Sequence, residues 1–125
     1  MPTNLIFKIG TKEKMHVIVL EKLNLTAIMT EEFKNTLLPY LQKSIKNLVL
    51  DFSKVQSIDT EFAEEMVNIQ QYFYKNNASM VYCNLPANVK NFLSEQGLIK
   101  KLNITPTESE AWDIVQMEEI EREFL

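Results

Sequence analysis

Apolar and polar positions follow two different periods along this chain, and each period predicts a different kind of element. Short apolar runs, several of them rich in β-branched residues, have the length of strands. These runs lie at residues 5–9, 15–20, 47–52, 79–83 and 102–104. Other segments repeat apolar residues every three or four positions, which predicts helices with one buried face. These segments lie at residues 33–45, 62–73, 89–93 and 111–115.

The order of these segments predicts a fold class. Two strands come first and are expected to form a hairpin, with Gly10–Lys12 as its turn. Helices and strands then alternate, which is typical of an α/β sheet with at least one parallel crossover. We therefore predict a small mixed β-sheet with about four helices. The run at 47–52 is apolar throughout, as expected of a strand that is buried on both faces.

Local signals refine the helix boundaries. Thr30 offers a hydroxyl that suits the start of the first helix, and Pro39 should kink or divide that helix. Gly97 suits the end of the third helix. Thr105, followed by a proline, is expected to cap the last helix. The charged end, residues 117–125, is predicted to extend that helix as a solvated face, and docking of a basic partner there is the less favoured interpretation.

Composition limits the class of protein. The chain has 125 residues, 46% of them apolar and 24% charged, which is typical of one globular domain spanning residues 1–125. The net charge is −4 and Arg122 is the single arginine, so binding to nucleic acid is not expected. No apolar run reaches the ~20 residues of a membrane span, and residues 1–4 lack a secretory leader. These features favour a cytoplasmic protein without membrane insertion.

The residues that carry chemistry are few. One cysteine, Cys83, allows no internal disulfide, and one histidine, His16, allows few nucleophile–base pairs. Two glycines, Gly10 and Gly97, cannot make a glycine-rich phosphate loop. We therefore expect no catalytic residues, no cofactor and no metal site, and a role in binding or regulation.

The most informative segment runs from residue 48 to residue 60. A predicted buried strand ends at Asp51, and a short segment then delivers Asp59 and Thr60 to a helix start. Asp and Thr are favoured at this position simply because they cap helices. Asp51 is interpreted as a residue at the strand end that supports the Asp59 loop rather than as a ligand or a base.

This order of elements resembles the STAS domain, the family of sulphate-transporter tails and anti-sigma factor antagonists. The resemblance continues through residues 80–89, the helix that ends near Gly97 and the Glu110–Ala111 pair, so it covers nearly the whole chain. It implies a STAS-like α/β fold and a bacterial partner switch in transcription regulation. In such antagonists the hydroxyl beside the aspartate is phosphorylated by a serine/threonine kinase that is also the anti-sigma factor. The resemblance places that phosphoacceptor at Thr60, beside Asp59.

The implied docking surface comprises residues 22–26, residues 51–60 and the exposed side of the helix from Glu61. Its supporting residues are Asp51, Asp59, Glu61 and Asn24. The chain departs from the family pattern at two places. Asp59-Thr60-Glu61-Phe62 stands where Asp-Ser-Ser/Thr-Gly is usual, and Lys22-Leu23-Asn24-Leu25 lacks the usual glycine.

Two alternatives stay open at this point. One is a STAS scaffold subunit that is not phosphorylated, for example one that supports the ATPase of an ABC transporter. The other is a small-ligand sensor, which would need a pocket. The sequence does not define the oligomeric state, and a weak dimer is compatible with it.

Overall fold

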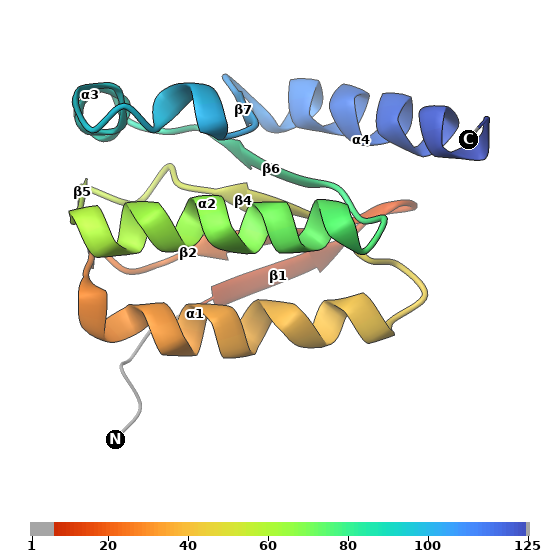
Figure 1. Cartoon of the computed structure of the whole chain (residues 1–125), viewed down its shortest axis with the longest axis horizontal. Helices are drawn as coiled ribbons and strands as arrows, with labels where there is room; N and C mark the ends of the chain where they lie inside the picture. Colours follow the sequence, from red (N-terminus) through yellow and green to blue (C-terminus); the bar gives the residue numbers. More distant parts are fainter. Residues whose placement is uncertain (1–6, 125) are drawn as a thin grey trace.

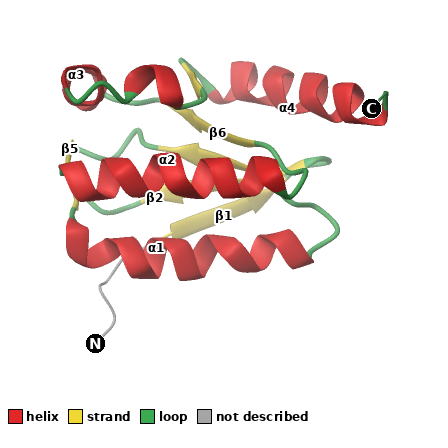
Figure 2. Ribbon diagram, in the orientation of Figure 1, coloured by secondary structure: helices red, strands yellow, loops and turns green. Residues whose placement is uncertain are grey.

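The computed structural model describes residues 7–124, which form one mixed sheet with helices packed on it (Figures 1 and 2). The strands are β1 (Phe7–Thr11), β2 (Met15–Leu20), β3 (Asn24–Leu25), β4 (Asn47–Asp51), β5 (Ser57–Ile58), β6 (Met80–Cys83) and β7 (Ile104–Thr105). The helices are α1 (Thr30–Leu37), α2 (Thr60–Lys75), α3 (Ala87–Glu95) and α4 (Glu108–Glu123), with 3₁₀ turns η1 (Ala27–Met29), η2 (Leu38–Gln42) and η3 (Ile99–Lys101). The predicted fold class, a small mixed sheet with four α-helices in the described residues, is confirmed.

The main sheet has the strand order β1-β2-β4-β6-β7. β1 and β2 form the predicted antiparallel hairpin, and all the other neighbours in this sheet are parallel. β3 and β5 form a separate short parallel pair. Because parallel strands need crossovers, the helices lie between successive strands and cover the faces of the sheet. The carboxyl ends of β4 and β6 thus lie at one edge of the sheet, which is also where β5 leads into α2 (Figure 1).

Two hydrophobic cores lie on opposite faces of the sheet. The larger core packs α1, α2 and α3 against one face, and its largest fully buried side chains include Phe33, Phe52, Phe62, Phe73 and Tyr82. The predicted stripe at residues 62–73 belongs to this core. The smaller core packs the first half of α4 against the other face, through Met15, Val17, Val49, Val81, Cys83, Ala111 and Val115. β4 contributes to both cores, as its unbroken apolar run predicts.

Several predicted boundaries were wrong by a few residues. Strand β1 continues through Gly10 to Thr11, and the turn begins at Lys12, whose N–H donates to the carbonyl of Met15 at 2.8 Å. Thr30 lies inside the first helical turn and donates to the carbonyl of Ala27, because a 3₁₀ turn precedes the helix. Thr105 is a strand residue paired with Cys83, and Thr107 caps α4 instead.

Other expectations agree with the structure. The α-helix gives way to 3₁₀ geometry at Leu38, next to Pro39, as the proline predicts. Gly97 follows the end of α3 with φ of 72°, a conformation that glycine adopts without strain. Cys83 is fully buried.

Candidate protein-binding site

Asp59 organises the start of α2. Its backbone is extended, and its Oδ1 accepts the N–H of Phe62 at 2.9 Å, which is the bond expected of an N-cap. Its Oδ2 accepts the N–H of Ala27 at 2.8 Å, from the 3₁₀ turn η1. Both carboxylate oxygens are therefore used, one within the helix and one across to a segment 32 residues earlier.

The loop before Asp59 is fixed by the short parallel pair of β3 and β5. The carbonyl of Leu23 accepts the N–H groups of Gln56 and Ser57, at 2.6 and 3.1 Å. The Ser57 hydroxyl donates to Oδ1 of Asn24 at 2.6 Å, and the N–H of Asp59 donates to the carbonyl of Leu25 at 3.0 Å. The predicted surface residues of the 22–26 loop and the 51–60 segment are thus brought together.

Thr60 is the first residue of α2, and its side chain is exposed. Its hydroxyl donates to Oε1 of Gln96, at the end of α3, across 3.3 Å. At the other end of α3, Asn88 donates from its amide to the carbonyl of Gln56. The sequence analysis missed both Gln96 and Asn88. No local pattern could have found them, since only the packing of α3 beside β5 and α2 places them here.

Asp51 does not have the partners expected of it. Its Oδ1 accepts the N–H of Ser53 at 2.8 Å, and its Oδ2 accepts the side-chain amide of Asn84 at 3.2 Å. It therefore holds the turn after its own strand and the loop after β6, rather than the Asp59 loop. The reason is topological, because β4 and β6 are neighbours and their carboxyl ends meet. Burial, with the Asp51 charge as a smaller cause, raises the pKa of the nearby Cys83 thiol to about 12.

The two residues after Thr60 point in different directions. Glu61 is exposed on the helix surface. Phe62 is fully buried, with its ring centroid 4.8 Å from that of Phe33. The phenylalanine that stands in the place of the usual glycine therefore fills the core and adds no bulk to the surface around Thr60.

Two apolar side chains are exposed on the segments that are hydrogen-bonded to the loop before Thr60. Leu23 is 50% exposed beside the β3–β5 pair, and Ile28 is 74% exposed in η1, next to the Ala27 that binds Asp59. A shallow groove of about 550 Å³ lies on the same side of the molecule, lined in part by Leu23, Lys54 and Pro86. Protein-binding surfaces typically combine exposed apolar residues with polar residues at their rim. Ile28 lay outside the predicted docking surface.

The described residues contain no group of three or more His, Cys, Asp or Glu side chains that could hold a metal ion. Nor does any helix between residues 7 and 124 have the length and apolar character needed to cross a membrane.

Comparison with protein families identifies the fold. The STAS domain family matches residues 11–111, most of the chain, so the chain belongs to the STAS domain family. The predicted family is therefore confirmed. No curated protein sequence matches the chain significantly.

Solved structures with the same fold are distant in sequence. TM1081 from Thermotoga maritima, assigned as an anti-sigma factor antagonist, is 23% identical, with 89% of each chain covered and a TM-score of 0.77. The unphosphorylated anti-sigma factor antagonist SpoIIAA of Bacillus is 17% identical, with 89% of this chain and 96% of that chain covered and a TM-score of 0.68. SpoIIAA has also been solved in a phosphorylated form. The murine anion transporter Slc26a9 is 18% identical over 86% of this chain but only 18% of its own, with a TM-score of 0.70.

Proposed function

We propose that this STAS domain is an anti-sigma factor antagonist whose binding is controlled by phosphorylation of Thr60. The observation that carries the proposal is the exposed Thr60, which directly follows the Asp59 cap; exposed Leu23 and Ile28 lie on the two segments that are hydrogen-bonded to the 56–59 loop. Its support from the family is that structural neighbours, SpoIIAA among them, are antagonists. The partner would be an anti-sigma factor with serine/threonine kinase activity, which would supply the nucleotide and the magnesium ion.

The physical basis of the switch is the placement of charge. A phosphate on Thr60 adds about −1.5 to −2 charges at neutral pH. It would lie beside Asp59 and Glu61, and its oxygens would replace the hydroxyl that now donates to Gln96. Under a docked partner this charge would lose its water, so contact with Leu23 and Ile28 would become unfavourable. The fold itself would tolerate the phosphate, since it sits at the positive end of α2.

A pull-down from native cell extract tests the proposal. We expect the wild-type chain and Thr60→Ala to capture the same kinase-like anti-sigma factor, and Thr60→Glu to lose it. Ser109→Glu is the matched control, because Ser109 is also exposed near the start of a helix, and it should keep the partner. Incubation of the captured complex with ATP should phosphorylate the wild-type chain at Thr60 and leave Thr60→Ala unmodified.

Equal capture of one partner by the wild type, Thr60→Ala and Thr60→Glu would contradict the switch. The second candidate, a constitutive scaffold for a transporter ATPase, would then be favoured if that partner were an ATPase subunit. Its support is the permanent charge of Glu61 beside Thr60 and the likeness to a domain within an anion transporter. Ile28→Glu should abolish capture under both functions. It therefore tests whether this surface binds the partner, independently of whether Thr60 controls the binding.

A further inference from the structure

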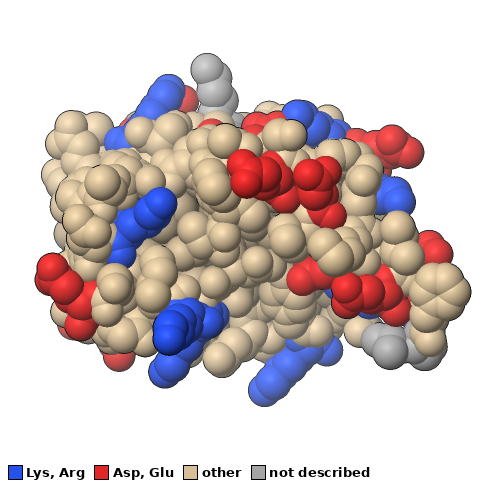
Figure 3. Space-filling view, turned by 90° about the horizontal axis from the view of Figure 1, so that it is seen from above, with Lys and Arg blue, Asp and Glu red and all other residues tan. Residues whose placement is uncertain are grey.

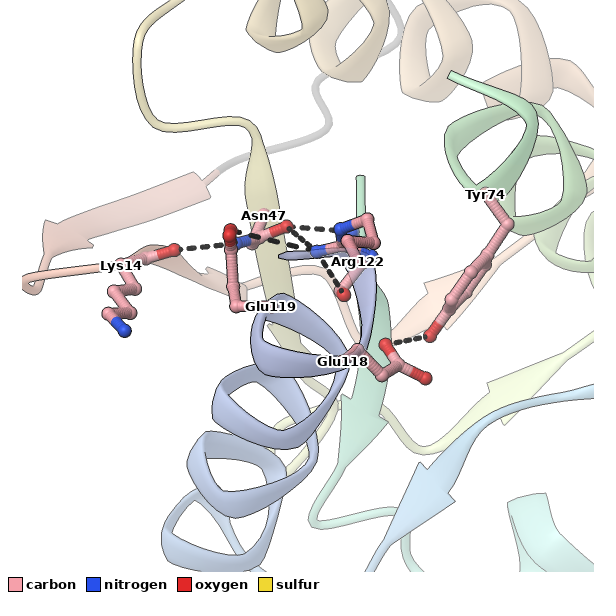
Figure 4. A network of polar contacts seen from close by, with 7 residues as sticks. Lys14, Asn47, Tyr74, Glu118, Glu119 and Arg122 are labelled. Atoms are coloured by element: carbon pink, nitrogen blue, oxygen red, sulfur yellow. Dashed lines mark hydrogen bonds and ion pairs between the residues drawn. The ribbon is translucent and has the colours of Figure 1, made fainter. Parts of the chain in front are cut away.

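The second half of α4 contacts the rest of the domain through polar groups. The hydroxyl of Tyr74 donates to Oε1 of Glu118 at 2.6 Å. Nη2 of Arg122 donates to the Ser79 hydroxyl at 3.0 Å and to Oδ1 of Asn47 at 3.3 Å (Figure 4). Beyond Val115, therefore, the inward side of this helix is charged and hydrogen-bonded.

Asn47 is the centre of this network. It is only 4% exposed, and its amide donates both to the Lys14 carbonyl at 2.9 Å and to Oε1 of Glu119 at 3.1 Å. Its Oδ1 also accepts the backbone N–H of Ser79 at 2.8 Å. Because Asn47 begins β4 and Ser79 directly precedes β6, the network fixes the rotation of α4 against the amino ends of the two central strands.

The outward side of the same half-helix is apolar. Met117 is 52% exposed, Ile120 is 51% exposed and Phe124, which caps the helix, is 83% exposed. Their spacing of three and four residues places them in one stripe. A surface helix normally buries such a stripe and exposes its charges, as the first half of α4 does with Ala111 and Val115 inside. After Val115 the apolar side chains face outward and polar side chains face the sheet. The hydrogen bonds to Asn47, Tyr74 and Ser79 hold the helix in this rotation.

The exposed charged residues of α4 that border the stripe are acidic. Asp113 and Glu121 lie one turn before and one turn after Met117, and Glu123 lies one turn after Ile120; all three are exposed. Figure 3 shows acidic side chains gathered over the α4 half of this view of the molecule. The one basic residue of α4, Arg122, is turned inward to Asn47 and Ser79. The outward face is therefore a row of apolar side chains bordered by negative charge.

We propose that this face, Met117, Ile120 and Phe124 with their acidic border, binds a basic amphipathic helix of a partner protein. Such a helix would place its apolar side on the stripe and its lysine or arginine side chains opposite Asp113, Glu121 and Glu123. A second copy of this chain would oppose like charges, and so would an anionic membrane surface. The face lies at the amino ends of β4 and β6, at the opposite end of the molecule from β5 and the start of α2 (Figure 1). The proposal therefore does not depend on the function proposed for Thr60.

Titration of the ¹⁵N-labelled chain with designed peptides tests the proposal. The probe is an amphipathic helix of leucine and lysine, compared with a scrambled peptide of the same composition and with a leucine–glutamate version of the same pattern. We expect the leucine–lysine helix alone to bind, to shift the amide signals of Met117, Ile120 and Glu121, and to bind more weakly as salt is added. Ile120→Glu should weaken its affinity by about tenfold or more.

Tyr72→Glu is the matched control, because Tyr72 is 50% exposed on a different helix, and it should leave the affinity unchanged. Retained amide dispersion in Ile120→Glu shows that the variant is folded. Equal binding of the Ile120→Glu variant, equal binding of the scrambled or leucine–glutamate peptide, or shifts centred on Thr60 would each overturn the proposal. Sedimentation that shows a dimer lost in Ile120→Glu would also overturn it, since the stripe would then bind a second copy.

Discussion

The carboxylate of Asp59 accepts the backbone N–H of Ala27 at 2.8 Å while it also caps its own helix. One side chain thereby fixes both the start of α2 and the 3₁₀ turn that carries exposed Ile28. The proposed binding surface is built from loops far apart in the chain, so its shape depends on these two hydrogen bonds of Asp59. Asp59 is therefore a structural residue as well as the neighbour of Thr60.

Replacement of Asp59 by alanine should lower the free energy of unfolding. Loss of the cap costs about 1–2 kcal/mol, and the N–H of Ala27 also loses its partner. Urea denaturation measures the change. Thr60→Ala is the control, because its exposed hydroxyl makes one long bond to Gln96, and its effect should stay within about 0.5 kcal/mol. Equal effects of the two substitutions would show that the Asp59 bonds contribute nothing to stability.

Arg122→Ala should destabilise the second half of α4 without disturbing the first. The substitution leaves Asn47 and Ser79 with fewer partners in a mostly buried position, at a cost of about 1–3 kcal/mol. Hydrogen exchange should accelerate in residues 116–123 and stay slow around Ala111. Glu121→Ala, an exposed change one residue away, should leave exchange unaltered. Unchanged protection in Arg122→Ala would mean that the network does not hold the helix.

The two glycines form a matched pair. Neither has a heavy atom within 4 Å of the place where a Cβ would be, so an added methyl group meets no clash at either position. Gly97 has φ of 72°, where an L-residue costs roughly 1 kcal/mol, whereas Gly10 lies in strand β1 without a positive φ. Thermal denaturation should show Gly97→Ala destabilised and Gly10→Ala unchanged or slightly more stable. A similar melting temperature for the two variants would contradict the backbone argument.

Cys83 should resist thiol reagents in the folded protein. It is fully buried, and burial raises its pKa to about 12, so both access and the reactive thiolate are lacking near neutral pH. Labelling with a maleimide should proceed only as fast as the protein opens, and should become rapid in denaturant. Rapid labelling under native conditions would show that the smaller core opens readily around β6.

The raised pKa of Cys83 also predicts a loss of stability in alkali. The folded state holds the thiol proton more tightly than the unfolded state, so the unfolded chain releases its proton first as the pH rises. The stabilisation is complete below the ordinary pKa of 9.0 and declines as the pH rises from there towards about 12. Burial also raises the pKa of Tyr82, so this tyrosine contributes to the same loss of stability in alkali. The free energy of unfolding, measured from pH 8 upward, should decline less steeply in Cys83→Ala than in the wild type.

Local pattern was enough to predict most of the fold. The apolar runs located β2, β4 and β6, and the helical period located α2 and its buried stripe, because these signals depend only on neighbouring residues. The predicted boundaries at Thr30 and Thr105 were wrong because the local pattern of a threonine is ambiguous. Threonine favours both caps and strands, and the pairing of Thr105 with Cys83 in the sheet outweighed its tendency to cap.

The candidate site was predictable only in part. Asp59 and Thr60 were found because a cap and its neighbour adjoin in sequence. Ala27, Asn88 and Gln96 were not, since each reaches the site from a separate element and carries no pattern that indicates its partner. The same limit applies to the second half of α4, where the inward polar side became evident only with the network around Asn47.

The position of β4 has a consequence for how the chain reaches its native state. In the main sheet only the β1–β2 hairpin joins its strands through a short turn. The other pairings span crossovers, so β4 pairs with β2 and β6 only after two long segments of chain have closed. The run Leu48–Val49–Leu50 is fully buried in the native state. Before β4 has paired, it is a short, uncharged segment that can pair with the same segment of other chains. Folding that is slowed at the β2–β4 crossover should therefore lead to aggregation rather than to a stable intermediate.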